Sequence, residues 1–302
     1  MGMKFLVTGA HGLLGRSLLE PDLGVEMIGC GRGTSPVGKG AYHPLDLADP
    51  QAVFALLEKL RPDWVIHTAA LTDVDRCETD RDVARQINLG MVEHLAAACR
   101  QLDLGLVQLS TDYVFDGRNG PYGEEDPTNP LSYYGALKLQ SEGLVLQEGL
   151  RGLVLRTLWL YGYIPGTRRN LVTWPLEALA KGEQLRMVED QWGNPTYVGD
   201  LALALVELCL RQAQGLFHLG GTTYLTRYQL TQELARAFGL DPGLVQPVST
   251  AAANQKAPRP LRSGLRTQAL EQLLGRAPLG LAQGLEQLSG QEEFRRDFCH
   301  LF

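Results

Sequence analysis

The sequence lacks any apolar run long enough to cross a membrane. A membrane-spanning helix needs roughly 20 apolar residues in succession, whereas the run from Leu201 to Leu210 reaches about ten and includes Glu207. Near the N-terminus, Lys4 to Val7 is predicted to form a strand and lacks the features of a signal peptide. We therefore expect a cytoplasmic protein that has no membrane partner.

Cysteine and histidine are sparse and scattered. The five cysteines stand at positions 30, 77, 99, 209 and 299, and the six histidines are equally dispersed. No CxxC pair or other spacing typical of a metal site occurs. We expect buried, reduced thiols instead of disulfides, and no bound metal.

Positive charge is also in short supply. Lysine and arginine number 28 against 34 aspartates and glutamates, which gives a net charge of −6. A mildly acidic chain has no general attraction for nucleic acid, so no nucleic-acid partner is expected. The 44% of hydrophobic residues excludes a disordered chain, and 302 residues suffice for one large domain or two modest ones.

What the sequence does contain is an alternation of short apolar runs and longer amphipathic stretches over its first 157 residues. Continuous apolar runs bounded by Gly, Asp or Ser are typical of parallel strands buried on both faces. These runs are Phe5 to Thr8, Val25 to Cys30, Trp64 to Thr68, Leu104 to Ser110 and Leu153 to Thr157. Helices are expected between them, over about 12–20, 50–60, 80–102 and 132–147. The order predicts an α/β fold with a Rossmann-like, doubly wound parallel sheet.

After residue 157 the alternation loosens. Helical patterns cover about 170–182, 198–213, 226–239, 266–275 and 280–289, and short strand patterns cover 184–188, 215–219 and 244–248. We interpret residues 1–157 as a dinucleotide-binding domain that also carries the catalytic residues. Residues 158–302 are interpreted as a smaller C-terminal α/β portion that binds the substrate, which would lie in a cleft between the two.

Three glycines follow the first predicted strand. Gly9, Gly12 and Gly15 stand in a GxxGxxG spacing between this strand and an amphipathic helix. In this context the first glycine permits a tight turn, the second lets the backbone approach a pyrophosphate, and the third lets the helix pack close to the sheet. The helix N-terminus offers free N–H groups to the phosphates. The segment is therefore predicted to bind a dinucleotide.

The end of the second predicted strand carries Arg32, where an NAD-preferring site usually has Asp or Glu. A guanidinium can pair with a 2′-phosphate through two hydrogen bonds, so we expect NADPH as the cofactor, with NADH as the alternative. Arg32 can also be read as a solvated loop residue. Further along, Asp46 and Leu47 lie where a carboxylate could reach the adenine amino group.

Tyr134 and Lys138 form a YxxxK pair within a predicted helix. Positions four apart share one helix face, so the phenol and the ammonium should point the same way. A neighbouring ammonium is expected to lower the pKa of the phenol toward the range of a general acid or base. The same spacing also occurs in ordinary amphipathic helices. Tyr133 is the wrong candidate, because Leu137 stands four residues after it.

A polar segment, Ser110 to Gly117, follows the apolar run that starts at Leu104. It should lie at the carboxyl end of the sheet, where open α/β sheets carry their chemistry. Thr111 could donate a hydrogen bond to a substrate oxygen near Tyr134, although polar residues at strand ends also serve as turn formers. The order of glycine loop, strand-end Thr and YxxxK helix favours a nicotinamide-dependent oxidoreductase.

Longer blocks of the sequence resemble one enzyme family. The blocks are Arg61 to Ile66, Ala69 to Asp75, Ser110 to Gly117, Pro121 to Asp126, Asn129 to Tyr134, Leu155 to Gly162, Asp190 to Thr196 and Arg259-Pro260. They extend over about residues 3–265 and resemble the dTDP-4-dehydrorhamnose reductases, within the extended short-chain dehydrogenase/reductase superfamily. The blocks around Ser110 to Gly117 and Asp190 to Thr196 are the most specific.

The resemblance implies roles for the matched residues. Thr111, Tyr134 and Lys138 would form the catalytic set. The sugar and nucleotide would meet Thr72, Val74, Thr111, Asp112, Tyr113 and Trp159, and the cofactor would meet Gly9, Gly12, Leu13, Leu14, Gly15, Ala69, Ala70, Tyr134 and Lys138. The implied reaction reduces a 4-keto sugar carried on dTDP, with dTDP-4-dehydro-L-rhamnose giving dTDP-L-rhamnose. Hydride would come from NADPH and a proton from Tyr134, and the oligomeric state stays open, with a homodimer as one option.

The chain departs from the family at several positions. Leu71 stands where Tyr is usual, Leu158 where Ser is common, and Arg262 and Arg266 where Asn and Asp are frequent. These departures concern the contacts to sugar and base more than the chemistry.

Three other functions remain as alternatives. A dehydratase needs a second acid after Asp112, but this chain has Tyr113 there. A 4-epimerase usually has small residues where this chain has Thr111, Asp112 and Tyr113. Both functions are therefore disfavoured. The alternative from a different class is a non-catalytic, NADP-binding regulatory subunit similar to that of methionine adenosyltransferase, which shares several of the blocks. The presence of Thr111 and Trp159 favours catalysis.

Overall fold

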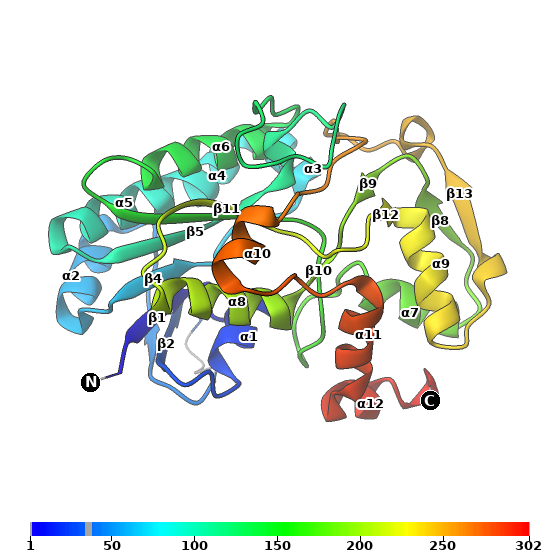
Figure 1. The fold of residues 1–302 in the computed structure, drawn as a ribbon, viewed down its shortest axis with the longest axis horizontal. Coiled ribbons are helices and arrows are strands. Elements are labelled where there is room, and N and C mark those ends of the chain that lie inside the picture. The colour runs from blue at the N-terminus through cyan, green and yellow to red at the C-terminus, as the bar shows by residue number, and fades with distance from the viewer. Residues whose placement is uncertain (1, 34–37, 302) are drawn as a thin grey trace.

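A seven-stranded sheet forms the centre of the computed structural model, which describes residues 2–33 and 38–301. Its strand order is β11-β6-β5-β4-β1-β2-β3, and every neighbouring pair is parallel (Figure 1). The strands are β1 (Lys4–Thr8), β2 (Glu26–Gly31), β3 (Tyr42–Pro44), β4 (Trp64–His67), β5 (Gly105–Thr111), β6 (Arg151–Thr157) and β11 (Gly215–Leu219). The predicted Rossmann-like α/β fold is confirmed.

Successive residues of the strands point to opposite faces, and each face packs against its own layer of helices. Phe5 and Val7 of β1 join a hydrophobic cluster with α1 (Leu13–Leu19), α8 (Val198–Leu210) and α10 (Gln268–Leu274). Leu6 joins the opposite cluster with α2 (Pro50–Leu60), α5 (Met91–Leu102) and the end of α6 (Tyr133–Val145). This burial on both faces explains why the strands read as continuous apolar runs.

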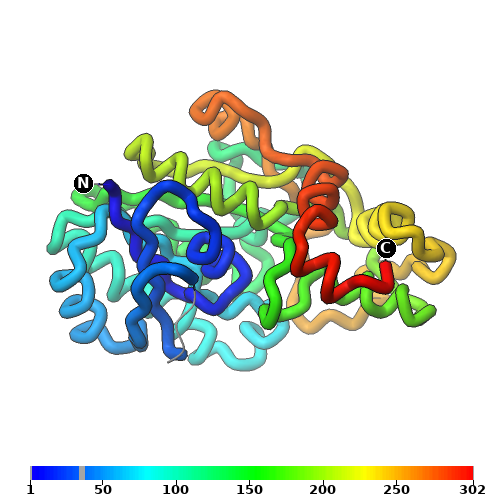
Figure 2. Tube along the Cα trace, turned by 90° about the horizontal axis from the view of Figure 1, so that it is seen from below, coloured from blue at the N-terminus to red at the C-terminus, as the bar shows by residue number. Residues whose placement is uncertain are grey.

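A smaller group of elements lies at the other end of the molecule. It contains α7 (Thr173–Ala180), α9 (Arg227–Ala237), α11 (Leu281–Gly290) and α12 (Glu292–Asp297), with the strand pairs β7 (Leu160–Tyr161)/β10 (Thr196–Tyr197), β9 (Trp192–Gly193)/β12 (Leu225–Thr226) and β8 (Leu185–Val188)/β13 (Val245–Val248). Much of this part packs around a cluster that includes Tyr161, Leu234 and Phe294. Figures 1 and 2 show the two termini at opposite ends of the molecule.

The chain returns to the main sheet after residue 157. Strand β11 pairs with β6 over Gly215–Leu219, and α8 packs on α1. Residues beyond 157 therefore serve both the sheet and the smaller group of elements. The division into two units at residue 157 stays a prediction.

The predicted elements recur with small shifts in their ends, and side-chain caps fix the starts of α2 and α9. Asp49 accepts hydrogen bonds from the N–H groups of Gln51 (2.9 Å) and Ala52 (3.1 Å) at the start of α2. Thr226 forms a capping box with Gln229 at the start of α9. The helix expected over 80–102 consists of α4 (Arg81–Arg85), a π-helical turn (Gln86–Gly90) and α5. Short elements that were not predicted include β3, α12, α3 (Val74–Thr79) and the two-residue strands β7, β9, β10 and β12.

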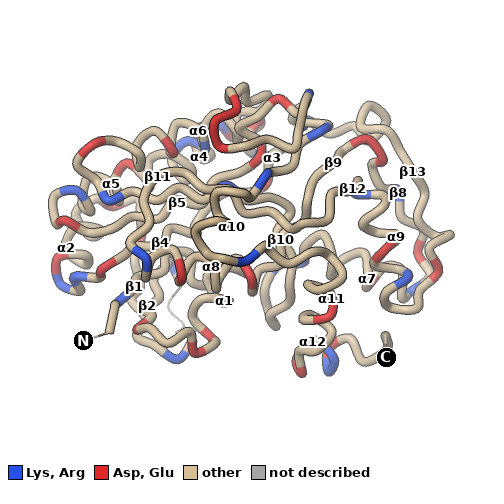
Figure 3. Tube along the Cα trace, viewed as in Figure 1, with Lys and Arg blue, Asp and Glu red and all other residues tan. Residues whose placement is uncertain are grey.

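Other sequence expectations concern thiols, charge and membranes. All described cysteines are free, and Cys30, Cys77, Cys99 and Cys209 are buried, whereas Cys299 is exposed. In the view of Figure 3 both signs of charge are mixed over the outer elements. Within the described ranges no helix has the length and apolarity needed to cross a membrane.

Candidate active site

The glycine loop joins β1 to α1 and lies against the end of β4. Gly9 has φ +68°, and a Cβ added there would come within 2.7 Å of the Ala69 backbone nitrogen. Gly12 caps α1 and its N–H donates to the Gly9 carbonyl (2.9 Å), while an added Cβ at Gly15 would overlap the Gly9 carbonyl oxygen. The loop is thus a tight backbone cradle, whose N–H groups at the start of α1 fit a pyrophosphate.

Other predicted cofactor residues surround this cradle. Leu14 is buried in the core, so only its backbone is available to a dinucleotide, and the partly buried Leu13 packs on the edge of the core. Ala69 and Ala70 follow β4 and are partly buried. The close approach of Ala69 to Gly9 brings these two predicted segments together.

The residues predicted to bind the adenosine part of the cofactor follow β2 and β3, beyond β1 at one edge of the sheet. Arg32 follows β2 with an exposed side chain, Asp46 is exposed, and Leu47 is buried in the core. The Asp46 carboxylate accepts a hydrogen bond from the Ala48 N–H at 3.0 Å. Tyr42, which was not predicted, donates from its hydroxyl to the Gly33 carbonyl (2.7 Å) and so shapes the segment next to Arg32.

The YxxxK pair lies on the buried face of α6. Ser132 caps this helix by accepting from the Gly135 N–H (3.2 Å). Tyr134 and Lys138 are 9% and 3% exposed, whereas the ring of Tyr133 lies outside them, 4.9 Å beneath the Arg81 guanidinium carbon. The helix thus directs the two predicted groups inward and Tyr133 away from them.

Burial dominates the electrostatics of the pair. It lowers the pKa of Lys138 to about 8, although the Glu142 carboxylate opposes the change. Burial also raises the pKa of Tyr134, the Asp112 charge raises it further, and the Thr111 hydroxyl opposes both. The expected lowering of the Tyr134 pKa was therefore wrong for this structure, because desolvation disfavours the phenolate.

Thr111 ends β5 beside this helix. Its hydroxyl donates to the Asp112 carboxylate (3.1 Å) and accepts from the Tyr113 N–H (3.2 Å). The Tyr113 ring meets the Tyr134 ring edge-on, with 6.0 Å between centroids. Thr111, Tyr113 and Tyr134 therefore converge at the carboxyl end of the sheet.

Asp112 is almost fully buried behind Thr111. Burial raises the pKa of its carboxyl to about 6, against hydrogen bonds from Ser263 and Thr111. The Ser263 hydroxyl donates to the carboxylate at 2.6 Å from a position 151 residues away in the chain. Asp112 therefore joins the end of β5 to the C-terminal part of the chain.

The remaining predicted substrate residues differ in exposure. Thr72 is exposed, and Val74 is partly buried at the start of α3. Trp159 is partly buried between β6 and β7, with φ +45°. A left-handed backbone is rare for a bulky residue and is often found at functional sites. An added Cβ at Gly193 would lie 3.0 Å from the Trp159 ring, so the glycine lets β9 approach the indole closely.

Comparisons with known proteins find relatives over most of the chain. A profile of the family described as RmlD substrate binding domain matches residues 3–291. The chain belongs to this family. A probable dTDP-4,6-dihydroxy-2-methyloxan-3-one 4-ketoreductase of Streptomyces antibioticus is 39% identical over 270 residues, which cover 87% of this chain and 86% of that relative. Methionine adenosyltransferase 2 subunit beta of Xenopus tropicalis is 32% identical over 281 residues, which cover 90% of this chain and 83% of that relative.

A solved structure is similar over nearly the whole length. The dTDP-4-dehydrorhamnose reductase from Bacillus anthracis str. Ames, in complex with NADP, has a TM-score of 0.83 and 29% identity, and the match covers 95% of this chain and 99% of that chain. The resemblance inferred from the sequence is thereby confirmed. Several residues that the sequence patterns did not point to also lie around the site.

One such residue is Asn88, which is buried in the π-helical turn. Its side chain accepts from the Leu71 N–H (2.9 Å) and donates to the Leu71 carbonyl (3.1 Å). These two bonds hold the loop that carries Ala70 and Thr72. Single π-helical turns within α-helices frequently lie at functional sites, but no sequence pattern marked this one.

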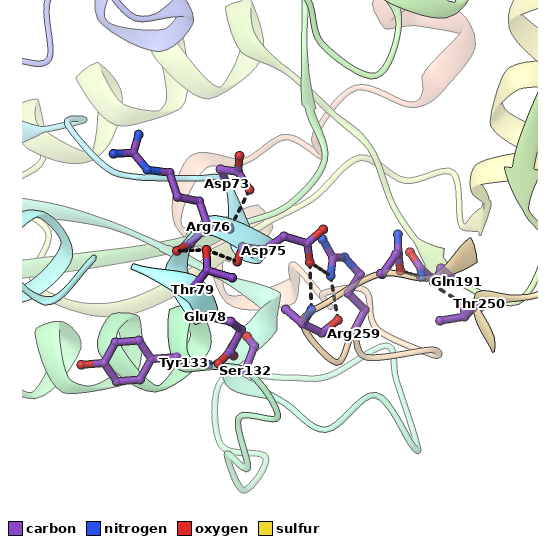
Figure 4. A network of polar contacts seen from close by, with 12 residues as sticks. Asp73, Asp75, Arg76, Glu78, Thr79, Ser132, Tyr133, Gln191, Thr250 and Arg259 are labelled. Atoms are coloured by element: carbon purple, nitrogen blue, oxygen red, sulfur yellow. Dashed lines mark hydrogen bonds and ion pairs between the residues drawn. The ribbon is translucent and has the colours of Figure 1, made fainter. Parts of the chain in front are cut away.

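A second group centres on α3 (Figure 4). The Asp75 carboxylate accepts from the Ala257 N–H and the Arg259 guanidinium, both at 2.8 Å. The Glu78 carboxylate accepts from the Tyr133 N–H at 2.6 Å. Helix α3 therefore joins the start of α6 to a segment of the C-terminal half of the chain.

A third group is the buried ion pair of Glu142 and Arg156 (2.7 Å), with the Ser110 hydroxyl also donating to Glu142. Glu142 follows Lys138 by one helical turn, a spacing that could have suggested it. The fourth is Arg227 at the start of α9, whose guanidinium carbon lies 4.5 Å from the centroid of the Trp159 ring.

Proposed function

We propose that this protein reduces the C4 keto group of a dTDP-linked deoxysugar with NADPH, converting dTDP-4-dehydro-L-rhamnose to dTDP-L-rhamnose. The observation that carries the proposal is the burial of Tyr134 and Lys138 on one face of α6, beside the end of β5 that bears Thr111. A related protein from Streptomyces antibioticus is named a probable 4-ketoreductase of a dTDP-linked compound. A structural neighbour is a dTDP-4-dehydrorhamnose reductase bound to NADP.

The mechanism assigns one task to each residue. When bound, NADPH supplies the hydride that reduces C4. The Thr111 hydroxyl, which donates to Asp112 in the structure, would turn its proton to the carbonyl oxygen and stabilise the negative charge that develops there. Tyr134 transfers its proton to that oxygen and completes the alcohol. Its raised pKa suits this direction, because the phenol keeps its proton at neutral pH until the alkoxide forms.

Lys138 stabilises the phenolate that remains after this transfer. Its ammonium is one helical turn from Tyr134, and below about pH 8 it carries the charge that this role needs. It also lies on the side of α6 that faces His67, whose pKa burial and the Lys138 charge lower to about 3. The neutral imidazole therefore leaves the lysine as the cation on that side.

The NADPH preference rests on Arg32, which follows β2 and is exposed to a ligand at this edge of the sheet. The 2′-phosphate would pair with its guanidinium. We expect Arg32→Ala to raise the KM for NADPH at least about tenfold, the size of one lost charge-assisted hydrogen bond, and to leave the KM for NADH unchanged. Steady-state kinetics with both cofactors measures this, and equal changes in the two values would assign Arg32 to solvent.

The alternative function is a non-catalytic, NADP-binding regulatory subunit, as the relative named methionine adenosyltransferase 2 subunit beta suggests. Incubation with NADPH and dTDP-4-dehydro-L-rhamnose tests the proposal, with the product identified by mass spectrometry and NMR. Formation of dTDP-L-rhamnose supports the reductase. Failure to reduce this sugar or its epimers, together with a stable complex with a methionine adenosyltransferase catalytic subunit, would favour the alternative.

Two further points belong to the proposal. We place the protein in the cytoplasm, where sugar nucleotides and NADPH are available, and cell fractionation tests this. We also propose a homodimer, which light scattering of the purified protein would reveal as twice the mass of the chain.

A further inference from the structure

Arg227 begins α9, directly after the N-cap residue Thr226. The N-cap geometry and a hydrogen bond from the Arg227 N–H to the Gln191 carbonyl (3.3 Å) fix the direction of the side chain's base. The side chain is partly buried, and its guanidinium lies over Trp159. A residue of the smaller group of elements therefore reaches the site formed by the main sheet.

The guanidinium also faces the end of β5. Burial raises the pKa of both Asp112 and Tyr113, and the charge of Arg227 opposes the rise at each. A hydrogen bond between Arg227 and the Tyr113 side chain adds to this effect. Arg227 thus lies among Asp112, Tyr113 and Trp159, three residues predicted to meet the substrate.

The Asp112 carboxylate interacts with the charge of this arginine, but the two side chains do not form an ion pair. Arg259, the other arginine that acts on Tyr113, pairs with Asp75 at 2.8 Å. For Arg227 the ion pairs of the described residues include no partner within 4.0 Å. A partly buried cation held by an aromatic ring and a phenol is suited to an anion that arrives with a ligand.

We propose that Arg227 binds the diphosphate of the nucleotide-linked sugar and makes the site selective for diphosphate-bearing substrates. The inference rests on the proposed function, because that substrate class supplies the anion. The guanidinium fork matches phosphate oxygens through two parallel hydrogen bonds. Stacking on Trp159 holds the fork in place before the ligand arrives and so reduces the entropy lost on binding. The arginine covers part of the indole and β9 approaches it at Gly193, so the sugar would meet only the part of the ring that stays exposed.

The test is calorimetric titration of dTDP and of thymidine into the NADP⁺-bound protein. In Arg227→Met, which keeps an apolar stem against Trp159, the Kd for dTDP should rise about 10- to 100-fold, the range for hydrogen bonds to a charged group. The Kd for thymidine and that for NADPH should stay within twofold of wild type. Arg227→Lys retains the charge without the fork, so an intermediate loss is expected.

Arg236→Met is the matched control. Arg236 lies at the other end of α9, half exposed and paired with Glu233 at 2.6 Å, so this change removes the same charge from the same helix. The Kd values of Arg236→Met for dTDP and for thymidine should equal those of wild type. The melting temperature of every variant is measured, and Arg227→Lys serves for the comparison if Arg227→Met does not fold.

Three results would overturn the proposal. An unchanged dTDP affinity in both Arg227 variants would show that the cation does not meet the diphosphate. Equal losses for dTDP and thymidine would show that Arg227 only supports Trp159, and a loss confined to NADPH would assign it to a cofactor phosphate. In each case wild-type reduction of the keto sugar would leave the proposed function standing. Wild-type protein that neither binds dTDP nor reduces the sugar would reject both.

Discussion

Tyr134 keeps its proton at neutral pH because burial raises the pKa of its phenol. A reductase needs this form, since the phenol must still carry a proton when the carbonyl oxygen becomes an alkoxide. The neighbouring Lys138 does not reverse the effect of burial in the structure. Its influence is greatest once the phenolate has formed, so the pair acts through the transition state more than through the resting tyrosine.

Replacing Tyr134 by Phe removes the proton donor and leaves the ring in place. We expect kcat to fall by about 10²–10⁴-fold, the usual contribution of a positioned general acid, with the Kd for NADPH unchanged. Stopped-flow kinetics and fluorescence titration measure the two quantities. Tyr133→Phe is the control, because its ring faces Arg81, and turnover near wild type in Tyr134→Phe would exclude this residue as the acid.

The activity should also depend on the charge of Lys138. Burial lowers its pKa to about 8, so the ammonium is present below that pH and is lost as the pH rises through it. We predict that kcat/KM, which reports the groups of the free enzyme, falls on the alkaline side with an apparent pKa about 8. A profile that stays flat well above pH 8 would show that the charge of Lys138 is not required.

Helix α6 is held to the sheet by a buried ion pair one turn beyond the lysine. Glu142 and Arg156 are both nearly inaccessible to water, and two hydrogen bonds of 2.8 and 2.7 Å join them. The guanidinium carbon of Arg156 lies 5.1 Å from the centroid of the Phe115 ring, and its Nη1 lies 3.2 Å from the His218 Nε2. The pair thus fixes α6 against β6 and β11, and with it the position of Lys138.

Breaking this ion pair should lower the free energy of unfolding and should also shift the pH dependence of kcat/KM. Glu142→Gln leaves the Arg156 cation buried without a counter-charge, which costs about 3–5 kcal/mol. Because the Glu142 charge raises the pKa of Lys138, its removal should move the alkaline limb of kcat/KM to lower pH. Arg156→Met removes the opposite charge and should move the limb to higher pH.

Urea denaturation and pH–rate profiles of the two single variants and of Glu142→Gln/Arg156→Met measure these effects. The double variant should lose less stability than the sum of the singles, since neither charge is then left alone. A strictly additive loss, with an unmoved alkaline limb, would contradict a link between the ion pair and Lys138.

At the same scale, the elements with a clear apolar pattern could be predicted, including short strands such as β8 and β13, whereas elements without one could not. Strands such as β1 and β5 are buried on both faces, and their apolar runs reveal them directly. Helix α3 has six residues and buries only Cys77, so it leaves no amphipathic period to detect. Its position depends on Asp73 as its cap and on the contacts of Asp75 and Glu78, which come from tertiary structure.

Across the whole molecule, the glycine loop, the strand-end Thr111 and the YxxxK pair are local motifs visible in the sequence, and the resemblance to a family implied further residues such as Trp159. The contacts between distant segments are not visible in the sequence. Ser263 reaches Asp112 across 151 residues, and Ala257 reaches Asp75 across 182. Such pairs have no common pattern in a single sequence, which is why Ser263, Asp75 and Arg227 could not be foreseen.

These long-range contacts belong to one segment, residues 249–263, which we call the C-terminal strap. Asp190 holds its beginning by accepting from the Thr250 N–H (2.9 Å) and hydroxyl (2.6 Å), and Asp75 holds its middle. Its end passes Gly117, whose carbonyl accepts from the Arg262 N–H at 2.7 Å. The strap therefore joins α3, the loop after β5 and the smaller group of elements around the site.

The hydrogen bonds of Asp75 to Ala257 and Arg259 should determine how often the strap detaches from α3 beside the site. Burial raises the pKa of Asp75, but the hydrogen bonds from Arg259 and Ala257 outweigh it, so the pKa is lowered overall. A lowered carboxyl pKa means that the contact is complete at neutral pH and is lost as the pH falls through that value. Because Asp75 is partly exposed, the stability at stake is about 1 kcal/mol or less.

Asp75→Asn should therefore change binding more than folding. We expect the KM for the keto sugar to rise several-fold, by up to about tenfold for a loss near 1.4 kcal/mol, while the free energy of unfolding falls by less than about 1 kcal/mol. Limited proteolysis should cut the strap faster, since a loop with fewer anchors opens more often. Asp80→Asn is the matched control, because Asp80 directly follows the same helix and pairs with Arg76 on its exposed side. If Asp75→Asn leaves both the KM and the cleavage rate as they are in Asp80→Asn, the strap does not depend on this contact.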